Sequence, residues 1–295
     1  MDGEIVTIEV PQGNAPERID RFLKGQYPDY SRNYFQNLLE KGAIRVNGAP
    51  VKKRNLIAPQ DSVEIAFIEH EEIPLVPQDI PLDTLYEDEH ILCVNKPAGL
   101  VVHPGAGNKD HTLVNALLFR LGALPENGLR PGIVHRLDKD TSGVIVTAKT
   151  TRAHLAMSEI FANRQIKKTY HAIALGNPGT RRLTSPIGRH PIYRQKMCVR
   201  DRGGKIAVTD IETLSFKEGI SFLKIGLHTG RTHQIRVHLQ SINCPLLGDA
   251  VYGVQKFGAT RPLLHASSLH FIHPFTHEEL HIEAPLPADF SPFIS

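Results

Sequence analysis

The segment Gly132-Ile-Val-His-Arg-Leu-Asp-Lys-Asp-Thr-Ser-Gly143 carries more chemistry than any other stretch of the chain. Apolar residues precede its charged part and Val144–Val146 follow it, so we expect an exposed turn between two strands. A carboxylate held in such a turn beside Arg136 is a candidate nucleophile. Asp138 and Asp140 share a face only if the backbone is extended, and they diverge in a turn. Their spacing alone therefore does not establish a paired acid and base.

Three other readings of this segment are open on its residues alone. The first is an Asx-type turn, in which Asp and Thr side chains cap the loop backbone. The second is the DxDxT motif of magnesium-dependent aspartyl-phosphate hydrolases, but that motif follows an apolar strand directly, whereas His135 and Arg136 intervene here. The third, an aspartic-protease motif, is weakest because DTSG has an extra residue and no second copy is present.

A second cluster, His228-Thr-Gly-Arg-Thr-His-Gln-Ile-Arg-Val-His-Leu239, lies nearly one hundred residues downstream. Gly230 predicts a turn from strand to helix, with a helix over 232–241. Arg231 would then stand at the helix start and Arg236 about one turn later. Both guanidinium groups could reach a carboxylate or phosphate bidentately.

A short basic stretch, Lys167-Lys168-Thr169-Tyr170, places an aromatic ring at the start of a predicted strand. Such a ring can stack on a base extruded from RNA, and the lysines can hold its phosphates. A tyrosine on an ordinary strand face is the alternative.

Length and composition limit the class of protein. The chain has 295 residues, enough for roughly two domains, and its 41% hydrophobic and 22% charged residues are typical of a globular protein. The formal net charge is +3, so any basic surface must be local. No apolar run is long enough for a membrane span and the N-terminus lacks the pattern of a secretion signal, so we expect a cytoplasmic protein.

We expect no metal site. The three cysteines are far apart and have no CxxC spacing. His233 and His238 are five apart, which does not fit a helical zinc pair. A run of four histidines between residues 270 and 281 is interrupted by Pro274, which argues against one helical face.

The predicted fold class is α+β. Residues 1–70 form a small unit with two short helices and a hairpin at Asn47-Gly48. Residues 71–82 are acidic and proline-rich, and we expect a linker there. Residues 83–295 form the larger domain, a mostly antiparallel mixed sheet with flanking helices. In this domain strands are predicted over 91–95, 132–136, 143–148, 169–174, 197–199, 207–214, 222–227 and 280–283, and helices over 115–121, 153–161 and 232–241.

The small unit carries local positive charge around its second helix and hairpin, where a phosphate backbone could lie. A solvated surface is the alternative on charge alone. The candidate RNA-binding residues are Arg32, Lys41, Arg45, Lys52, Lys53 and Arg54.

Taken together, several segments in order resemble the RluA/RluD-type pseudouridine synthases of large-subunit ribosomal RNA. The first block, with Lys41-Gly-Ala-Ile-Arg-Val-Asn-Gly48, also resembles an S4 RNA-binding domain. The matching segments of the larger domain are Asn95-Lys-Pro-Ala-Gly-Leu-Val-Val-His-Pro-Gly105, His135–Gly143, Lys168-Thr-Tyr170, Gly230–Leu239 and Leu264-His-Ala266.

The resemblance implies an isomerase that needs no cofactor. It breaks the glycosidic bond of a uridine, rotates the base and joins C5 to the ribose. By motif position Asp138 is the essential aspartate, and whether it attacks C1′, attacks the base or first removes a ribose proton stays open. Tyr170 matches the tyrosine that stacks on the target base and is implicated in the C5 proton step.

The resemblance also implies RNA contacts. Arg136 corresponds to the arginine that contacts RNA and supports base extrusion. Arg236 is the expected ion-pair partner of Asp138, with Arg231 as the substitute, and Leu264 is expected to pack against the base. The expected partner is large-subunit ribosomal RNA, free or in a pre-ribosomal particle, and we expect a monomer. A non-catalytic RNA-binding module and a magnesium-dependent phosphatase are the rival functions.

Overall fold

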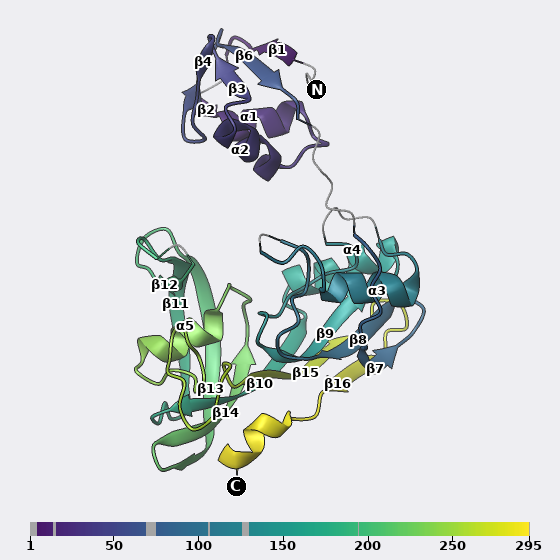
Figure 1. Ribbon diagram of the computed structural model, residues 1–295, viewed down its shortest axis with the longest axis vertical. Coiled ribbons are helices and arrows are strands. Elements are labelled where there is room, and N and C mark those ends of the chain that lie inside the picture. The colour runs from purple at the N-terminus through teal and green to yellow at the C-terminus, as the bar shows by residue number, and fades with distance from the viewer. Residues whose placement is uncertain are drawn as a thin grey trace. The chain divides into compact units, whose positions relative to one another are not determined.

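The chain forms two compact units, Met1–Ile73 and Pro74–Ser295, each with its own core (Figure 1). The computed structural model describes residues 5–13, 16–68, 75–105, 107–125, 130–193 and 195–294. Within these ranges no helix is long and apolar enough to cross a membrane.

The smaller unit packs two helices against a small antiparallel sheet. Ser31 caps the second helix by accepting a hydrogen bond from the Tyr34 backbone N–H at 3.1 Å. Asn47 and Gly48 both have positive φ angles, 51° and 76°, as a two-residue hairpin turn of this kind requires. Both predicted helices and the hairpin are therefore confirmed. The elements are α1 (Ile19–Gln26), α2 (Arg32–Glu40), a sheet in the order β1 (Ile5–Glu9), β6 (Ser62–Ala66), β3 (Ile44–Val46), β4 (Ala49–Pro50), and the pair β2 (Glu17–Arg18) with β5 (Leu56–Ile57).

The larger unit is built on one ten-stranded mixed sheet, with helices packed along it (Figure 1). Every strand pair is antiparallel except β9 with β15, so the predicted α+β class with a mostly antiparallel sheet is confirmed. The strand order is β12 (Met197–Val199), β11 (Arg181–Arg189), β13 (Lys205–Lys217), β14 (Ile220–Leu227), β10 (Ile166–Leu175), β15 (Leu264–Ile272), β9 (Ser142–Ala148), β8 (Ile91–Lys96) and β7 (Asp83–Glu87), with β16 (Glu279–Glu283) on β15. The helices are α3 (Leu113–Leu121), α4 (Thr151–Ala162), α5 (Gln234–Ser241) and the 3-10 helix η1 (Ala288–Phe293).

One strand prediction was wrong, and one strand was missed. Residues 132–136 form no strand, and only Ile133 makes an isolated bridge, to Thr147. Strand β11, which contains Pro186, was missed. The short partner β12 begins its pairing only at Ile187, so the missing N–H of Pro186 costs no ladder hydrogen bond on that side.

Residues 75–82 lie against the larger unit. Leu75 and Leu82 pack on its core, and the Asn115 side chain donates a hydrogen bond to the carbonyl of Val76 at 2.8 Å. Residues 71–74 of the predicted linker lie outside the described part of the chain.

The carboxyl end of the 132–143 segment is fastened to β15. Gly143 has a φ of +112°, and a Cβ placed there would lie 2.1 Å from the carbonyl oxygen of Ala266. Only glycine fits this approach. The Ser142 hydroxyl also lies 2.9 Å from Nδ1 of His265. The chain therefore leaves the turn and enters the middle of the sheet at a fixed position.

Candidate active site

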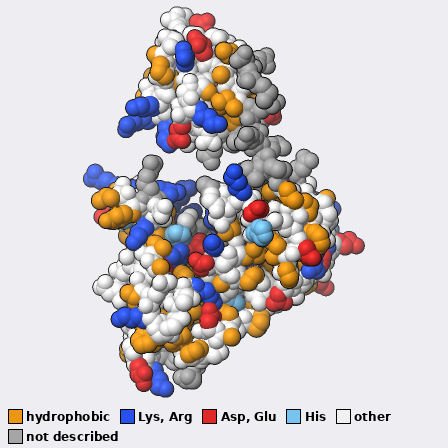
Figure 2. All heavy atoms as spheres, viewed as in Figure 1, with side chains coloured by type: hydrophobic (Ala, Val, Ile, Leu, Met, Phe, Trp, Pro, Cys, Tyr) orange, Lys and Arg blue, Asp and Glu red, His pale blue; other side chains and the backbone are white. Residues whose placement is uncertain are grey.

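A pocket of about 550 Å³ opens where the 132–143 segment meets the start of α5. Lys, Arg and His side chains gather around a hollow on this face of the larger unit (Figure 2). The lining residues come from four distant segments: 136–138 with Thr141, Tyr170, Leu227 with 230–236, and Leu264.

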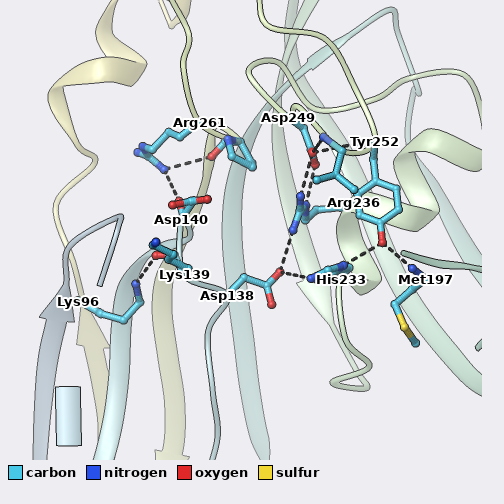
Figure 3. A network of polar contacts seen from close by, with 12 residues as sticks. Lys96, Asp138, Lys139, Asp140, Met197, His233, Arg236, Asp249, Tyr252 and Arg261 are labelled. Atoms are coloured by element: carbon cyan, nitrogen blue, oxygen red, sulfur yellow. Dashed lines mark hydrogen bonds and ion pairs between the residues drawn. The ribbon is translucent and has the colours of Figure 1, made fainter. Parts of the chain in front are cut away.

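Asp138 presents a partly exposed carboxylate to this pocket. The Thr141 N–H donates to the Asp138 carbonyl at 3.1 Å, which closes a turn, so the side chains of Asp138 and Asp140 diverge (Figure 3). Its Oδ2 lies 3.5 Å from Nη1 of Arg236 and 3.9 Å from Nε2 of His233. Its Oδ1 accepts no hydrogen bond from any described residue and is free to meet a substrate.

Arg236 is held in place by a second carboxylate. Its Nε and Nη2 donate to both oxygens of Asp249 at 2.7 and 2.9 Å, and both side chains are buried. Asp249 also accepts the backbone N–H groups of Val251 and Tyr252. Burial acts to raise the pKa of Asp249, but the bonds from Arg236 outweigh it and hold that pKa below its usual value. Arg236 thus points its remaining nitrogen, Nη1, at Asp138.

His233 completes this side of the pocket from a left-handed backbone position, φ 56°, just before α5. The Tyr252 hydroxyl oxygen accepts the N–H of Met197 at 2.7 Å and lies 2.8 Å from Nδ1 of His233. With the hydroxyl proton directed at Nδ1, the ring carries its own proton on Nε2, which faces Asp138. Burial lowers the pKa of His233, against the opposing effect of the Asp138 carboxylate. The lowered pKa favours the neutral imidazole, whose Nε2 faces the carboxylate.

Two cations hold the backbone of the Asp138 turn from the other side. Lys96 is fully buried, and its Nζ donates to the carbonyls of Pro97, Leu100 and Lys139 at 2.8–3.0 Å (Figure 3). Burial lowers the pKa of Lys96 to about 7. On the far side, Arg261 donates to the carbonyl of Asp140 at 3.1 Å. The turn is thus fixed through its carbonyls, which leaves the Asp138 side chain clear.

Tyr170 and Leu264 supply the apolar wall of the pocket. Both are buried, on the neighbouring strands β10 and β15. Burial raises the pKa of the Tyr170 phenol, and the nearby Asp138 carboxylate adds to this effect. The phenol therefore stays protonated, and its hydroxyl has no hydrogen-bond partner among the described residues.

The two other candidate arginines differ in position. Arg136 is exposed at the pocket mouth and forms no ion pair within the described ranges. Arg231 was predicted at a helix start, which is wrong, because α5 begins only at Gln234. Arg231 instead lies in a turn, donates Nε to the carbonyl of Ile206 at 3.1 Å and does not contact Asp138. The side chain of Gln234 fastens this turn by accepting the Arg231 N–H at 3.0 Å.

In the smaller unit, two of the six candidate RNA-binding residues are engaged in ion pairs. Arg32 donates to the buried carboxylate of Asp20 at 2.9 Å, and Lys53 lies 2.9 Å from Glu40. The other four form no ion pair with any described residue: Lys41, Arg45, Lys52 and Arg54.

The sequence motifs missed His233, which lines the pocket, and four residues that hold the lining in place: Lys96, Asp249, Tyr252 and Arg261. Two of them, Lys96 and His233, lie inside the quoted motifs, but nothing in the spacing assigned them partners. The others carry no local signal, because their contacts depend on the folded chain. No group of three or more His, Cys, Asp or Glu suited to a metal ion occurs in the described ranges.

Comparison with known proteins bears directly on this site. A family model for RNA pseudouridylate synthase matches residues 90–241, and an S4 domain model matches residues 17–61. The chain belongs to the RNA pseudouridylate synthase family. It is therefore an isomerase that acts on RNA, and the matched range contains all the residues that line the Asp138 pocket except Leu264.

Relatives match along nearly the whole chain. A "Ribosomal large subunit pseudouridine synthase D" of Xanthomonas campestris pv. campestris is 39% identical over 100% of this chain and 93% of that protein. An uncharacterized RNA pseudouridine synthase of Bacillus subtilis, YlyB, is 40% identical over 98% of this chain and 97% of that protein. Among solved structures, human RNA Pseudouridylate Synthase Domain Containing 1 aligns with a TM-score of 0.59 and 26% identity, covering 70% of this chain and 84% of that one.

Proposed function

We propose that this protein converts specific uridines of large-subunit (23S) ribosomal RNA to pseudouridine, with Asp138 as the nucleophile and the target base flipped out of its helix. The N1–C1′ bond breaks, the uracil turns within the pocket, C5 bonds to C1′, and the C5 proton is released. Extruding a base costs a few kcal/mol, which contacts in the pocket must offset.

The observation that carries this proposal is the asymmetric setting of the Asp138 carboxylate. Arg236 and His233 both face Oδ2, while Oδ1 is open to the pocket. Arg236 thus orients the carboxylate through Oδ2, with His233 nearby, and leaves the oxygen that would react open. The same geometry serves attack on C1′, attack on the base and removal of a ribose proton.

Tyr170, Leu264 and Arg136 take the remaining roles. The Tyr170 ring offers a stacking surface for the uracil, and its unpartnered hydroxyl can take part in the proton transfer at C5. Leu264 packs beside the base. Arg136, unpaired at the pocket mouth, contacts the RNA backbone and stabilises the extruded nucleotide.

The choice of ribosomal RNA rests on the names of relatives such as the Xanthomonas protein, and on the S4 match. We propose residues 1–70 as an RNA-binding domain, residues 71–82 as a linker and residues 83–295 as the catalytic domain. The protein would act as a monomer in the cytoplasm, on free RNA or on an assembling subunit.

The reaction is tested by release of tritium from [5-³H]uridine in unmodified large-subunit ribosomal RNA. We expect release without added cofactor and in the presence of a magnesium chelator, provided that the RNA is refolded beforehand. Small-subunit RNA from the same source is the matched control and should release none. Absence of release from free RNA and from partly assembled large subunits would contradict the proposal.

A further inference from the structure

A second pocket, of about 930 Å³, adjoins the Asp138 pocket and has no role in the chemistry proposed above. The two pockets share five lining residues, so they lie on either side of the same wall. A polymer that places one nucleotide in the first pocket must pass a neighbouring nucleotide close to the second. The shared residues are Arg136, Tyr170, Leu227, Gly230 and Arg231.

The second pocket is lined by four cations and no carboxylate. Arg136, Arg164 and Lys168 form no ion pair or side-chain hydrogen bond with any described residue. Arg231 donates a hydrogen bond from Nε to the backbone carbonyl of Ile206, and its other guanidinium nitrogens form no hydrogen bond within the described ranges. By contrast, Arg182 on β11 is paired with the carboxylate of Asp210. The unneutralised charge at this pocket therefore calls for an anion from outside the protein.

Asp210, which lines a neighbouring pocket together with Arg164 and Lys168, is already occupied. Asp210 is held by Arg182 at 2.6 Å and by the lining residue His228 at 2.7 Å. Burial lowers the pKa of Lys168, and the nearby Arg164 adds to this effect. These cations thus repel one another, and a bound anion would relieve the repulsion.

The rest of the lining suits a nucleotide rather than a free anion. The rings of His135 and Phe161 stack at 4.5 Å, and Val134, Ala162 and Leu227 add apolar surface. Arg164 occupies a left-handed position, φ 58°, just beyond α4, where glycine is the usual residue. An arginine in this backbone conformation costs free energy relative to glycine, and such residues are common at functional sites.

We propose that this basic pocket binds the phosphodiester of a nucleotide adjacent to the target uridine, through Lys168 and Arg164 with Arg136 at the shared wall. This inference deepens the proposed function and rests on it. The pocket would contribute to RNA binding and to positioning of the target uridine, but not to the chemical step.

The test measures RNA binding in an Asp138→Asn background, so that the RNA stays unreacted. The probe is an RNA stem-loop that carries the mapped target uridine. Lys168→Met keeps the apolar stem of the side chain and removes the charge, and Arg164→Gln alters an exposed side chain. Each should weaken binding roughly tenfold or more and reduce the slope of log K against log salt by about one. Lys217→Met, at the far end of β13, is the matched control and should change neither.

The second arm places the contact on the RNA. A methylphosphonate that removes the charge of the phosphate 5′ or 3′ to the target uridine should weaken binding to the wild-type pocket. If the proposal is right, one of these RNAs should show no further loss with Lys168→Met, because the charge pair is already broken. Lys168→Arg should restore affinity for the unmodified RNA.

Two binding results would overturn the inference: unchanged affinity and salt slope for both variants, or full additivity with both methylphosphonates. A third would be a lower single-turnover rate at saturating RNA with unchanged affinity, measured for the same variants with Asp138 intact. The last would assign the residues to the chemistry. Failure of the proposed function would appear separately, as no tritium release by the wild-type enzyme, whereas the binding arm reads the pocket alone.

Discussion

At the residue scale, the site depends on how one arginine is shared by two carboxylates. Arg236 gives two nitrogens to Asp249 and turns the third toward Asp138. The motif around Arg236 pointed to a carboxylate partner, and the structure supplies two. Asp249 could not be predicted, because no local pattern marks an aspartate that acts through the folded chain.

We predict that Arg236→Met lowers the free energy of unfolding by about 3–5 kcal/mol, because it strands the buried charge of Asp249. Arg231→Met, whose side chain forms no ion pair, should change it by about 0.5 kcal/mol or less. Urea unfolding of the wild type and the two variants measures both changes in the free energy of unfolding.

The double variant Arg236→Met/Asp249→Asn separates stability from activity. It should recover much of the lost stability, since the unpaired charge is gone and the amide oxygen can still accept the N–H groups of Val251 and Tyr252. It should remain inactive because Asp138 has lost its cation. Recovery of activity together with stability would show that Arg236 acts only as a structural residue.

At the element scale, periodicity predicted the helices well and the strands less well. Helix α4 was expected from its apolar spacing, and it occupies Thr151–Ala162. Residues 132–136 look like a strand because they are apolar, yet they pack as irregular backbone. Their shape is set by His135, whose Nε2 accepts the N–H of Val146 in β9 at 3.0 Å while its ring stacks on Phe161 of α4.

This contact predicts a pH dependence of stability. Burial, with a smaller effect of Lys168, lowers the pKa of His135 to about 3, against about 6.5 in an unfolded chain. Between these values the unfolded state binds more protons, so the free energy of unfolding should fall as the pH falls from about 6.5 to about 3. The slope from this one group is at most about 1.4 kcal/mol per pH unit.

His135→Gln keeps a hydrogen-bond acceptor for Val146 and removes the titration. Chemical denaturation of both proteins between pH 4 and pH 7 checks the prediction. The variant should show a flatter pH profile than the wild type, and parallel profiles would mean that His135 is not the titrating group.

At the scale of the whole molecule, the small unit's charge was visible in the sequence, but the use of each charge was not. Arg32 appears as free as Arg45 when only the sequence is read. In the structure Arg32 binds the buried Asp20, together with Arg18 and Gln36, and so ties the two helices together. Ion pairs with carboxylates that are distant in the sequence therefore distinguish cations that stabilise the fold from cations that are available to bind RNA.

We predict that replacing the four unpaired cations by glutamine weakens binding to large-subunit RNA and reduces the salt slope by up to about 0.7–0.9 per lost contact. The positions are Lys41, Arg45, Lys52 and Arg54. Stability should change little. Arg32→Gln should instead lower the stability of the small unit. Filter binding across a salt series, with thermal unfolding in parallel, distinguishes these outcomes, and an unchanged slope would remove this unit from the RNA surface.

The central claim is that the Asp138 carboxylate, and not its neighbour two residues on, performs the chemistry. The most direct test compares single-turnover tritium release by Asp138→Asn and Asp140→Asn at saturating ribosomal RNA. We predict that Asp138→Asn releases none while it still binds RNA, and that Asp140→Asn, whose side chain points away from Arg236, retains most of the wild-type rate. Turnover by Asp138→Asn, or loss of turnover by Asp140→Asn with RNA binding intact, would contradict the account.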